Sequence, residues 1–211
     1  MIKLFISVLG FLFIFCKEDD YSIAAGTIAE RNKSAINVKA FCYEDSNWIQ
    51  HFREFRMAVY QDNKDKVKSF FVFPVMSENN EIWDLVTDGN TEPLKLHPGK
   101  IKPFTEKDFD QYFGKLFSRR FINALLKVKT DELYKKGETA TIQLSEEKAT
   151  TYQMIASFDK DDKTLNLNLA SNTIMKDKDG EVLDGGEFSI NYIFSILANG
   201  QIRFSQVRMA G

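Results

Sequence analysis

The sequence is poor in the side chains that most often carry chemistry, with two cysteines and two histidines in 211 residues. A disulfide framework is therefore excluded, although an unmodified Cys16 could still bridge to Cys42. Otherwise Cys42 is expected to be a small buried hydrophobe. His51 and His97 fit no zinc-ligand spacing, so we predict no metal site, with His51 at a helix boundary and His97 in a turn.

No sign of charge dominates, because 28 basic residues stand against 30 acidic ones and the formal net charge is −2. A nucleic-acid partner is not expected without a basic surface. Glycine-rich phosphate loops and the G-x-S-x-G elbow are also missing. The segment Asp177-Lys178-Asp179-Gly180 fails as a calcium loop, since acids are missing at the first and twelfth positions. We therefore predict no catalytic residue and no cofactor, and a binding protein rather than an enzyme.

Long apolar runs are absent except near the start, where residues 4–15 are uncharged and Cys16 follows. Twelve helical residues span about 18 Å, less than the roughly 30 Å hydrocarbon core of a bilayer. This run is typical of a signal-peptide core. Because Cys16 ends the run, the segment resembles a bacterial lipoprotein signal. The resemblance implies that Cys16 is lipidated and becomes the mature N-terminus.

The predicted location is therefore the bacterial cell envelope, with the exported protein anchored in a membrane through its N-terminal lipid. Cleavage near residues 22–25 and an uncleaved anchor are open alternatives. We predict a signal peptide over residues 1–16, a tether over 17–39, and a single domain over 40–211. Hydrophobic residues make up 44% of the chain and aromatic residues 13%, enough to fill a core in that domain.

Two helical regions are predicted in the first part of this domain. Asp45 or Ser46 would cap a helix with an apolar stripe formed by Trp48, Phe52, Phe55 and Val59. Thr105 with Asp108 resembles a capping box ahead of a second stripe, Phe109, Tyr112, Phe113 and Leu116. Apolar residues continue after Ser118, which predicts two helices or one kinked helix up to Lys129. These aromatic side chains are expected to form core, with the lining of an apolar hollow as the alternative.

The last third alternates as strands do, over residues 139–144, 151–158, 164–170, 187–197 and 201–209. Turns are expected over residues 159–163 and 176–186, and Asn199-Gly200 predicts a type I′ hairpin. Helices followed by antiparallel strands indicate an α+β fold, with the N-terminal helices packed on one face of a curved sheet.

Three segments carry a further resemblance: Phe52-x-x-Phe55-x-x-Ala58-Val59, the run Phe70 to Phe73 ending at Pro74, and Phe104 to Phe117. They look like segments of small bacterial envelope proteins with an NTF2-like or cystatin-like cone. The resemblance implies a cone whose hollow holds a small apolar ligand or an envelope protein as partner. It brings no functional residues to carry over, so the ligand-binding residues stay unknown.

The function predicted from the sequence is that of an envelope-anchored lipoprotein with a non-catalytic domain that binds a ligand or a partner. An enzyme using the cone hollow is one alternative, and it would need an inward carboxylate such as Asp110 or Glu54. An envelope assembly or structural factor is the other. Arg119 and Arg120, next to Lys115, are expected to form a solvated helix face.

Overall fold

The structure is a computed structural model that describes residues 48–90, 99–146, 150–176 and 182–211. The predictions for the signal peptide, Cys16, the tether, Cys42 and the first N-cap lie outside the described residues. So do those for His97 and the segment 177–180.

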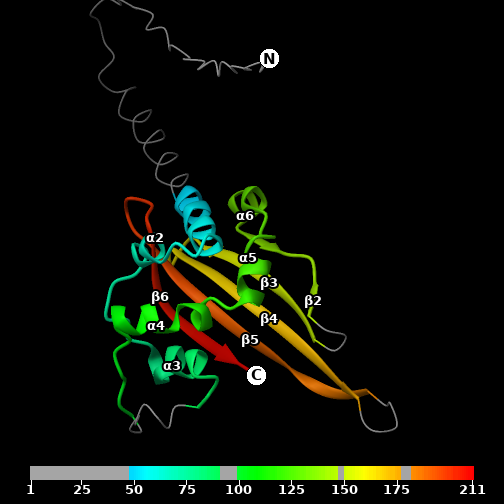
Figure 1. The fold of residues 1–211 in the computed structure, drawn as a ribbon. Coiled ribbons are helices and arrows are strands. Elements are labelled where there is room, and N and C mark those ends of the chain that lie inside the picture. Colours follow the sequence, from blue (N-terminus) through cyan, green and yellow to red (C-terminus); the bar gives the residue numbers. More distant parts are fainter. Residues whose placement is uncertain (1–47, 91–98, 147–149, 177–181) are drawn as a thin grey trace, which may run out of the picture. The chain divides into compact units, whose positions relative to one another are not determined.

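The first described element is a helix over residues 48–60, and its predicted stripe is confirmed. Trp48, Phe52, Phe55 and Val59 are each at most 2% exposed. Five α-helices and a short 3₁₀-helix follow among the described residues: α2 Lys64–Lys68, η1 Glu78–Asn80, α3 Glu81–Val86, α4 Glu106–Leu116, α5 Arg119–Leu125 and α6 Thr130–Lys136 (Figure 1).

The capping box at the start of α4 is confirmed. The Thr105 hydroxyl accepts a hydrogen bond from the Asp108 amide, and the Asp108 carboxylate accepts one from the Thr105 amide. The Ser118 hydroxyl caps α5 by accepting a hydrogen bond from the Phe121 amide, so the second helical region is two helices rather than one.

Helix α6 was not predicted, because Leu133 is its one buried apolar side chain and no apolar period marks it. Its end was nevertheless visible in the sequence. Lys135 and Lys136 fill the last turn, and Gly137 follows with φ of 82°, a left-handed conformation that glycine adopts at little cost.

In the described part of the chain, six strands form one open antiparallel sheet: β1 Glu138–Ala140, β2 Leu144–Glu146, β3 Thr150–Asp159, β4 Thr164–Lys176, β5 Val182–Ile196 and β6 Ile202–Ala210. Their order is β1, β3, β4, β5, β6, with β2 also paired to β3. The fold is therefore a mixture of helices and an antiparallel sheet that is not closed, as the α+β prediction requires. The finer prediction of a cone stays a prediction.

One predicted turn is wrong, because the segment 176–186 does not consist of turn alone. Strand β4 runs to Lys176 and β5 begins at Val182, so much of that segment belongs to a β-hairpin. Strand β3 reaches only Thr173 of β4, and β6 reaches only Ser189 of β5. Beyond these points β4 and β5 pair with each other, and among the described residues no other strand joins them. We call this extension the hairpin arm (Figure 1).

The hairpin between β5 and β6 exists, but its turn is not type I′. The Gly200 amide donates to the Leu197 carbonyl, and positive φ at this turn belongs to Gly200, at 76°, and not to Asn199. A type I turn followed by a left-handed glycine is the common three-residue hairpin loop. The longer loop leaves the Gly200 carbonyl available to another element.

An aromatic core joins the helices to the sheet. Phe55 is fully buried, and its ring packs edge-on against Phe70, Phe117 and Phe194 at centroid distances of 5.4, 5.8 and 4.9 Å. Phe194 lies on β5, so this contact fixes the first helix on the sheet. Edge-to-face pairs of this kind add about 0.5–1.5 kcal/mol each beyond the area that they bury.

The outer edge of β6 is covered by the segment that follows α2. The Phe204 amide donates to the Phe70 carbonyl at 2.8 Å, and the Arg203 guanidinium donates to the Ser69 carbonyl at 2.6 Å. Further along, the Met209 amide donates to the Glu81 carboxylate. This edge therefore offers few free groups for pairing with another strand.

Candidate functional site

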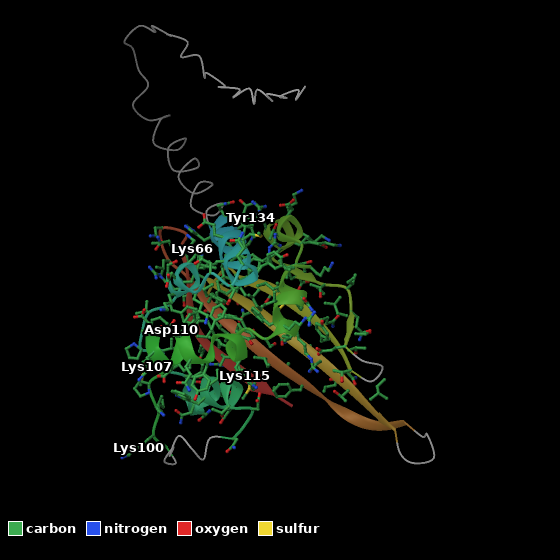
Figure 2. The ribbon with its side chains drawn as sticks, viewed as in Figure 1. Lys66, Lys100, Lys107, Asp110, Lys115 and Tyr134 are labelled. Carbon is green, nitrogen blue, oxygen red and sulfur yellow. The ribbon has the colours of Figure 1, made fainter. Side chains whose placement is uncertain are left out.

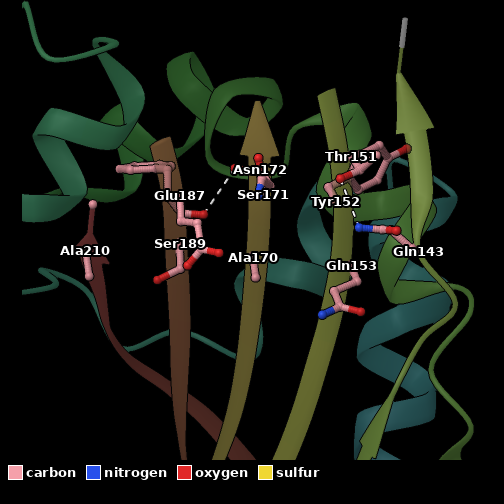
Figure 3. Close-up of a pocket in the computed structure, with 12 residues that line it drawn as sticks. Gln143, Thr151, Tyr152, Gln153, Ala170, Ser171, Asn172, Glu187, Ser189 and Ala210 are labelled. Atoms are coloured by element: carbon pink, nitrogen blue, oxygen red, sulfur yellow. Dashed lines mark hydrogen bonds between the residues drawn. The ribbon is translucent and has the colours of Figure 1, made fainter. Parts of the chain in front are cut away.

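The two faces of the sheet differ in chemistry. On the face that the helices cover, the side chains are apolar and buried, for example Met154, Leu167 and Phe194. On the opposite face the matching positions are mostly polar and half-buried: Gln153, Ser157, Asn166, Asn168, Ser189, Asn191, Ser195, Ser205 and Gln206. We call this the helix-free face, and Figure 3 views part of it with the helices behind the strands.

A cavity of about 460 Å³ lies at the end of this sheet that carries the hairpin arm. Its lining comes from β3, β4, β5, the end of β6 and the residue before β2: Gln143, Thr151, Tyr152, Gln153, Ala170, Ser171, Asn172, Glu187, Phe188, Ser189, Ala210 and Gly211. Figure 3 shows Gln153, Ala170 and Ser189 side by side on three neighbouring strands.

The cavity exists because small side chains meet in one row across the strands. Gln153 pairs with Ala170, Ala170 with Ser189, and Ser189 with Ala210. Directly paired residues lie on one face of a sheet, so this row is a shallow floor. The next row toward the arm, Thr151, Asn172 and Glu187, forms one wall. The row on the other side, Ile155, Asn168, Asn191 and Arg208, borders the floor but does not line the cavity. We call the floor and its one wall the trough.

The polar side chains of the trough have unused hydrogen-bonding capacity. The Gln143 amide donates to the Thr151 hydroxyl at 3.0 Å, which fixes one end. Among the described residues, the side chains of Gln153, Asn172 and Ser189 have no hydrogen-bond partner. Each of these side chains can both donate and accept, so together they can match a ligand that carries hydroxyl or amide groups.

The row beside the floor, outside the cavity lining, holds two acceptors without a partner. Asn168 and Asn191 face each other across β4 and β5, and the Oδ1 atom of each is buried with no hydrogen-bond partner among the described residues. The Asn191 amide donates to Asn166 at 3.4 Å. A buried carbonyl oxygen without a donor costs about 1–3 kcal/mol of stability.

The electrostatics of the trough are simple. Glu187 is the one charged side chain among the described lining residues. Arg208 lies in the row beside the floor, outside the lining, where it forms an exposed ion pair with Glu78 at 3.4 Å. A second carboxylate or a histidine that could act with Glu187 as an acid and base pair does not occur in that lining.

The hollow predicted between helices and sheet is filled by core side chains. Phe109, Phe113 and Phe117 are at most 4% exposed, which confirms the core interpretation of this aromatic set. Tyr192 is also fully buried there, and its hydroxyl donates to the Leu116 carbonyl at 2.8 Å. Burial raises the pKa of Tyr192 above its usual value, so the ring stays neutral and acts as a structural link between β5 and α4.

Asp110 and Glu54, the carboxylates considered for an enzyme, both turn away from the core. Asp110 is exposed on α4 (Figure 2). It pairs with Lys68 at 2.8 Å. Lys68 also contacts Glu106, and these hydrogen bonds raise the pKa of Lys68. Glu54 pairs with Lys66 at 3.0 Å. Neither carboxylate faces a buried cavity.

The remaining candidates are structural. The ring Nδ1 of His51 donates to the Gly200 carbonyl at 2.9 Å, which ties the first helix to the last hairpin and confirms a satisfied boundary position. Lys115 pairs with Asp88 at 2.6 Å, and Arg120 pairs with Glu146. Arg119 and Arg120 are exposed, as expected for a solvated helix face.

The trough residues were missed because they lie far apart in the sequence and meet only through strand register. One signal was present: the alternation of leucine and asparagine over residues 165–169, which marks a sheet with one polar face. Among the described residues, no group of three or more His, Cys, Asp or Glu side chains could hold a metal ion. Their helices are also too short or too polar to cross a membrane.

The comparisons with known proteins identify no family. No protein-family model and no curated protein matches this chain. A solved structure that matches is a provisionally named ketosteroid isomerase from Shewanella frigidimarina NCIMB 400. It is 12% identical, the alignment covers 76% of this chain and 92% of that chain, and the TM-score is 0.27. A TM-score this low carries no argument, so the α+β class rests on the architecture described above.

Proposed function

We propose that this protein is a cell-envelope lipoprotein whose α+β domain holds a ligand in the trough without changing it chemically. The observation that carries the proposal is the lining of the trough. It combines several side chains that have free donors and acceptors with a single carboxylate, Glu187. Such a lining can bind and orient a polar molecule, whereas proton transfer usually needs a matched acid and base.

The proposal moves the binding site away from the place that the sequence suggested. An NTF2-like or cystatin-like cone would hold a small apolar ligand between helices and sheet, but Phe55, Phe117 and Phe121 fill that space here. The trough is on the other face and is polar. This also argues against the enzyme alternative, which depends on an inward carboxylate in the hollow.

The binding proposal is tested by screening the purified full chain, labelled with ¹⁵N, against small polar fragments that are neutral, cationic or anionic. We expect amide shifts to cluster at Gln153, Ala170 and Ser189 for at least one class. Ala170→Leu, which fills the floor, should abolish these shifts while the melting temperature stays near that of the wild type. If no fragment shifts the trough, or if fragments shift only amides of the aromatic core, the binding proposal is wrong.

The envelope location rests on Cys16, which lies outside the described residues, and it has its own test. Wild-type protein should partition into the detergent phase after Triton X-114 extraction of cells. Cys16→Ala should move it to the aqueous phase, because several acyl chains hold a protein firmly at about 0.8 kcal/mol per buried CH₂. Cys42→Ala is the matched control and should stay in the detergent phase. A wild-type protein found in the aqueous phase would contradict the anchor.

An assembly factor is a second candidate, and the hairpin arm favours it. The arm exposes two large apolar side chains, Ile174 at 45% and Phe188 at 44%, one on each face of the sheet. Replacing Ile174, which lies outside the lining of the trough, with Ser should leave trough binding by fragments unchanged if the trough is the site of function. Loss of a co-purifying envelope protein in that variant, with trough binding intact, would favour the assembly role.

A further inference from the structure

We infer that the ligand of the trough is a neutral oligosaccharide, an inference that rests on the binding function proposed above. The first reason is shape. The floor row crosses β3, β4, β5 and β6, and neighbouring strands lie about 4.8 Å apart, so the trough extends about 14 Å across the sheet. A site of this form suits a linear chain of rings better than a compact molecule.

The second reason is hydrogen bonding. A sugar hydroxyl both donates and accepts, and so do the side chains of Gln153, Asn172, Ser189 and Thr151. A ligand that only accepts or only donates hydrogen bonds would leave many of these side-chain donors or acceptors without a partner.

The third reason is charge. With Glu187 as the one charged side chain of the lining, an anionic ligand such as a phosphate or a uronic acid would be repelled by it and would find no cationic side chain among the lining residues. The methyl groups of Ala170 and Ala210 give the floor an apolar component, against which the C–H face of a sugar ring can pack.

An extended peptide fits the trough less well, although it also carries amide donors and acceptors. The backbone hydrogen bonds of a sheet lie in the plane of the sheet, and between β3 and β6 they are used in the ladders. A peptide that crosses the strands over the floor row therefore cannot join the sheet as a further strand. It would be limited to side-chain contacts.

The experiment is calorimetric titration of the full chain with neutral trisaccharides of glucose, mannose and N-acetylglucosamine. A galacturonic acid trimer, a chitosan trimer and a neutral tripeptide are the comparators. We expect binding of at least one neutral trisaccharide and at least tenfold weaker binding of every comparator. Gln153→Ala and Ser189→Ala should each weaken the neutral complex about 2- to 10-fold, the effect of one lost hydrogen bond.

Ser157→Ala is the matched control for Ser189→Ala, because Ser157 lies on the same face of the sheet but outside the trough. It should leave the affinity unchanged. If fragments bind the trough but the neutral trisaccharides do not, or if a charged trimer or the tripeptide binds best, the saccharide inference is wrong and the binding proposal stands. If no fragment shifts the trough, both fail. Equal effects of the two serine variants would also contradict the inference.

Discussion

Two threonines near the edge of the sheet allow one substitution to be tested in two opposite settings. Thr139 and Thr141 are 6% and 7% exposed and lie two residues apart, at the point where β1 ends and the chain bulges toward β2. The bulge places residues 141–143 opposite two residues of β3. There the Thr141 hydroxyl replaces a carbonyl group in the ladder and accepts a hydrogen bond from the Met154 amide at 3.0 Å. The Thr139 hydroxyl has no partner among the described residues.

Changing each threonine to valine should therefore shift stability in opposite directions. Thr141→Val leaves the Met154 amide buried without an acceptor, which costs about 1–3 kcal/mol. Burial of the added methyl group offsets about 0.8 kcal/mol of this cost. Thr139→Val removes a buried hydroxyl that has no partner, so we expect a gain of about 1–2 kcal/mol. The two variants should then differ by roughly 1–4 kcal/mol in the free energy of unfolding.

Urea denaturation followed by circular dichroism measures this difference, with unchanged m-values showing that the unfolded state is comparable. Hydrogen exchange gives a local readout, because the Met154 amide should exchange faster in Thr141→Val and not in Thr139→Val. Equal shifts of the same sign in both variants would refute the reasoning. So would a Met154 amide that keeps its protection after the Thr141 hydroxyl is removed.

Two further predictions concern the core. Phe55→Ala should lower the free energy of unfolding by about 3–5 kcal/mol and the melting temperature by roughly 6–20 °C. Met57→Ala is the control, because that side chain is 41% exposed on the same helix, and it should change the melting temperature little. Similar effects of the two variants would mean that the helix face is misplaced. Because the folded-state pKa of Tyr192 is raised, its contribution to stability is complete below about pH 10 and is lost above it. Wild type should therefore lose stability relative to Tyr192→Phe at up to about 1.4 kcal/mol per pH unit above pH 10, and parallel pH profiles in chemical denaturation would contradict this.

Much of the fold could be predicted from local sequence, because the relevant interactions are local. The capping box of Thr105 and Asp108 involves residues three apart, and the stripe of Phe52, Phe55 and Val59 follows from the helical period alone. The alternation of apolar and polar residues over residues 164–170 predicted a strand in the same local way. Helix α6 shows the limit of this approach, since it packs through Leu133 and leaves almost no apolar pattern.

The candidate site could not be predicted, because its geometry depends on pairing between distant residues. Gln153, Ala170, Ser189 and Ala210 are adjacent only once the register of four strands is known. A shift of one residue in any of them would turn its side chain to the helix-covered face and remove it from the floor. The length of the hairpin arm was hidden for a different reason: the Gly, Asp and Lys residues over 176–186 are typical of turns.

The contacts between the first helix and the last hairpin also limit the order in which the chain can fold. His51 bonds to Gly200 across 149 residues, and Arg203 bonds to Ser69 across 134. Closing such long loops is entropically costly, and folds that depend on them form slowly. A chain that emerges with its N-terminus first, from a ribosome or a translocation channel, holds Phe52 and Phe55 exposed until β5 and β6 have followed. This core can therefore be completed only after β5 and β6 have emerged, and a chaperone that binds during that interval would compete with these strands for the same aromatic stripe.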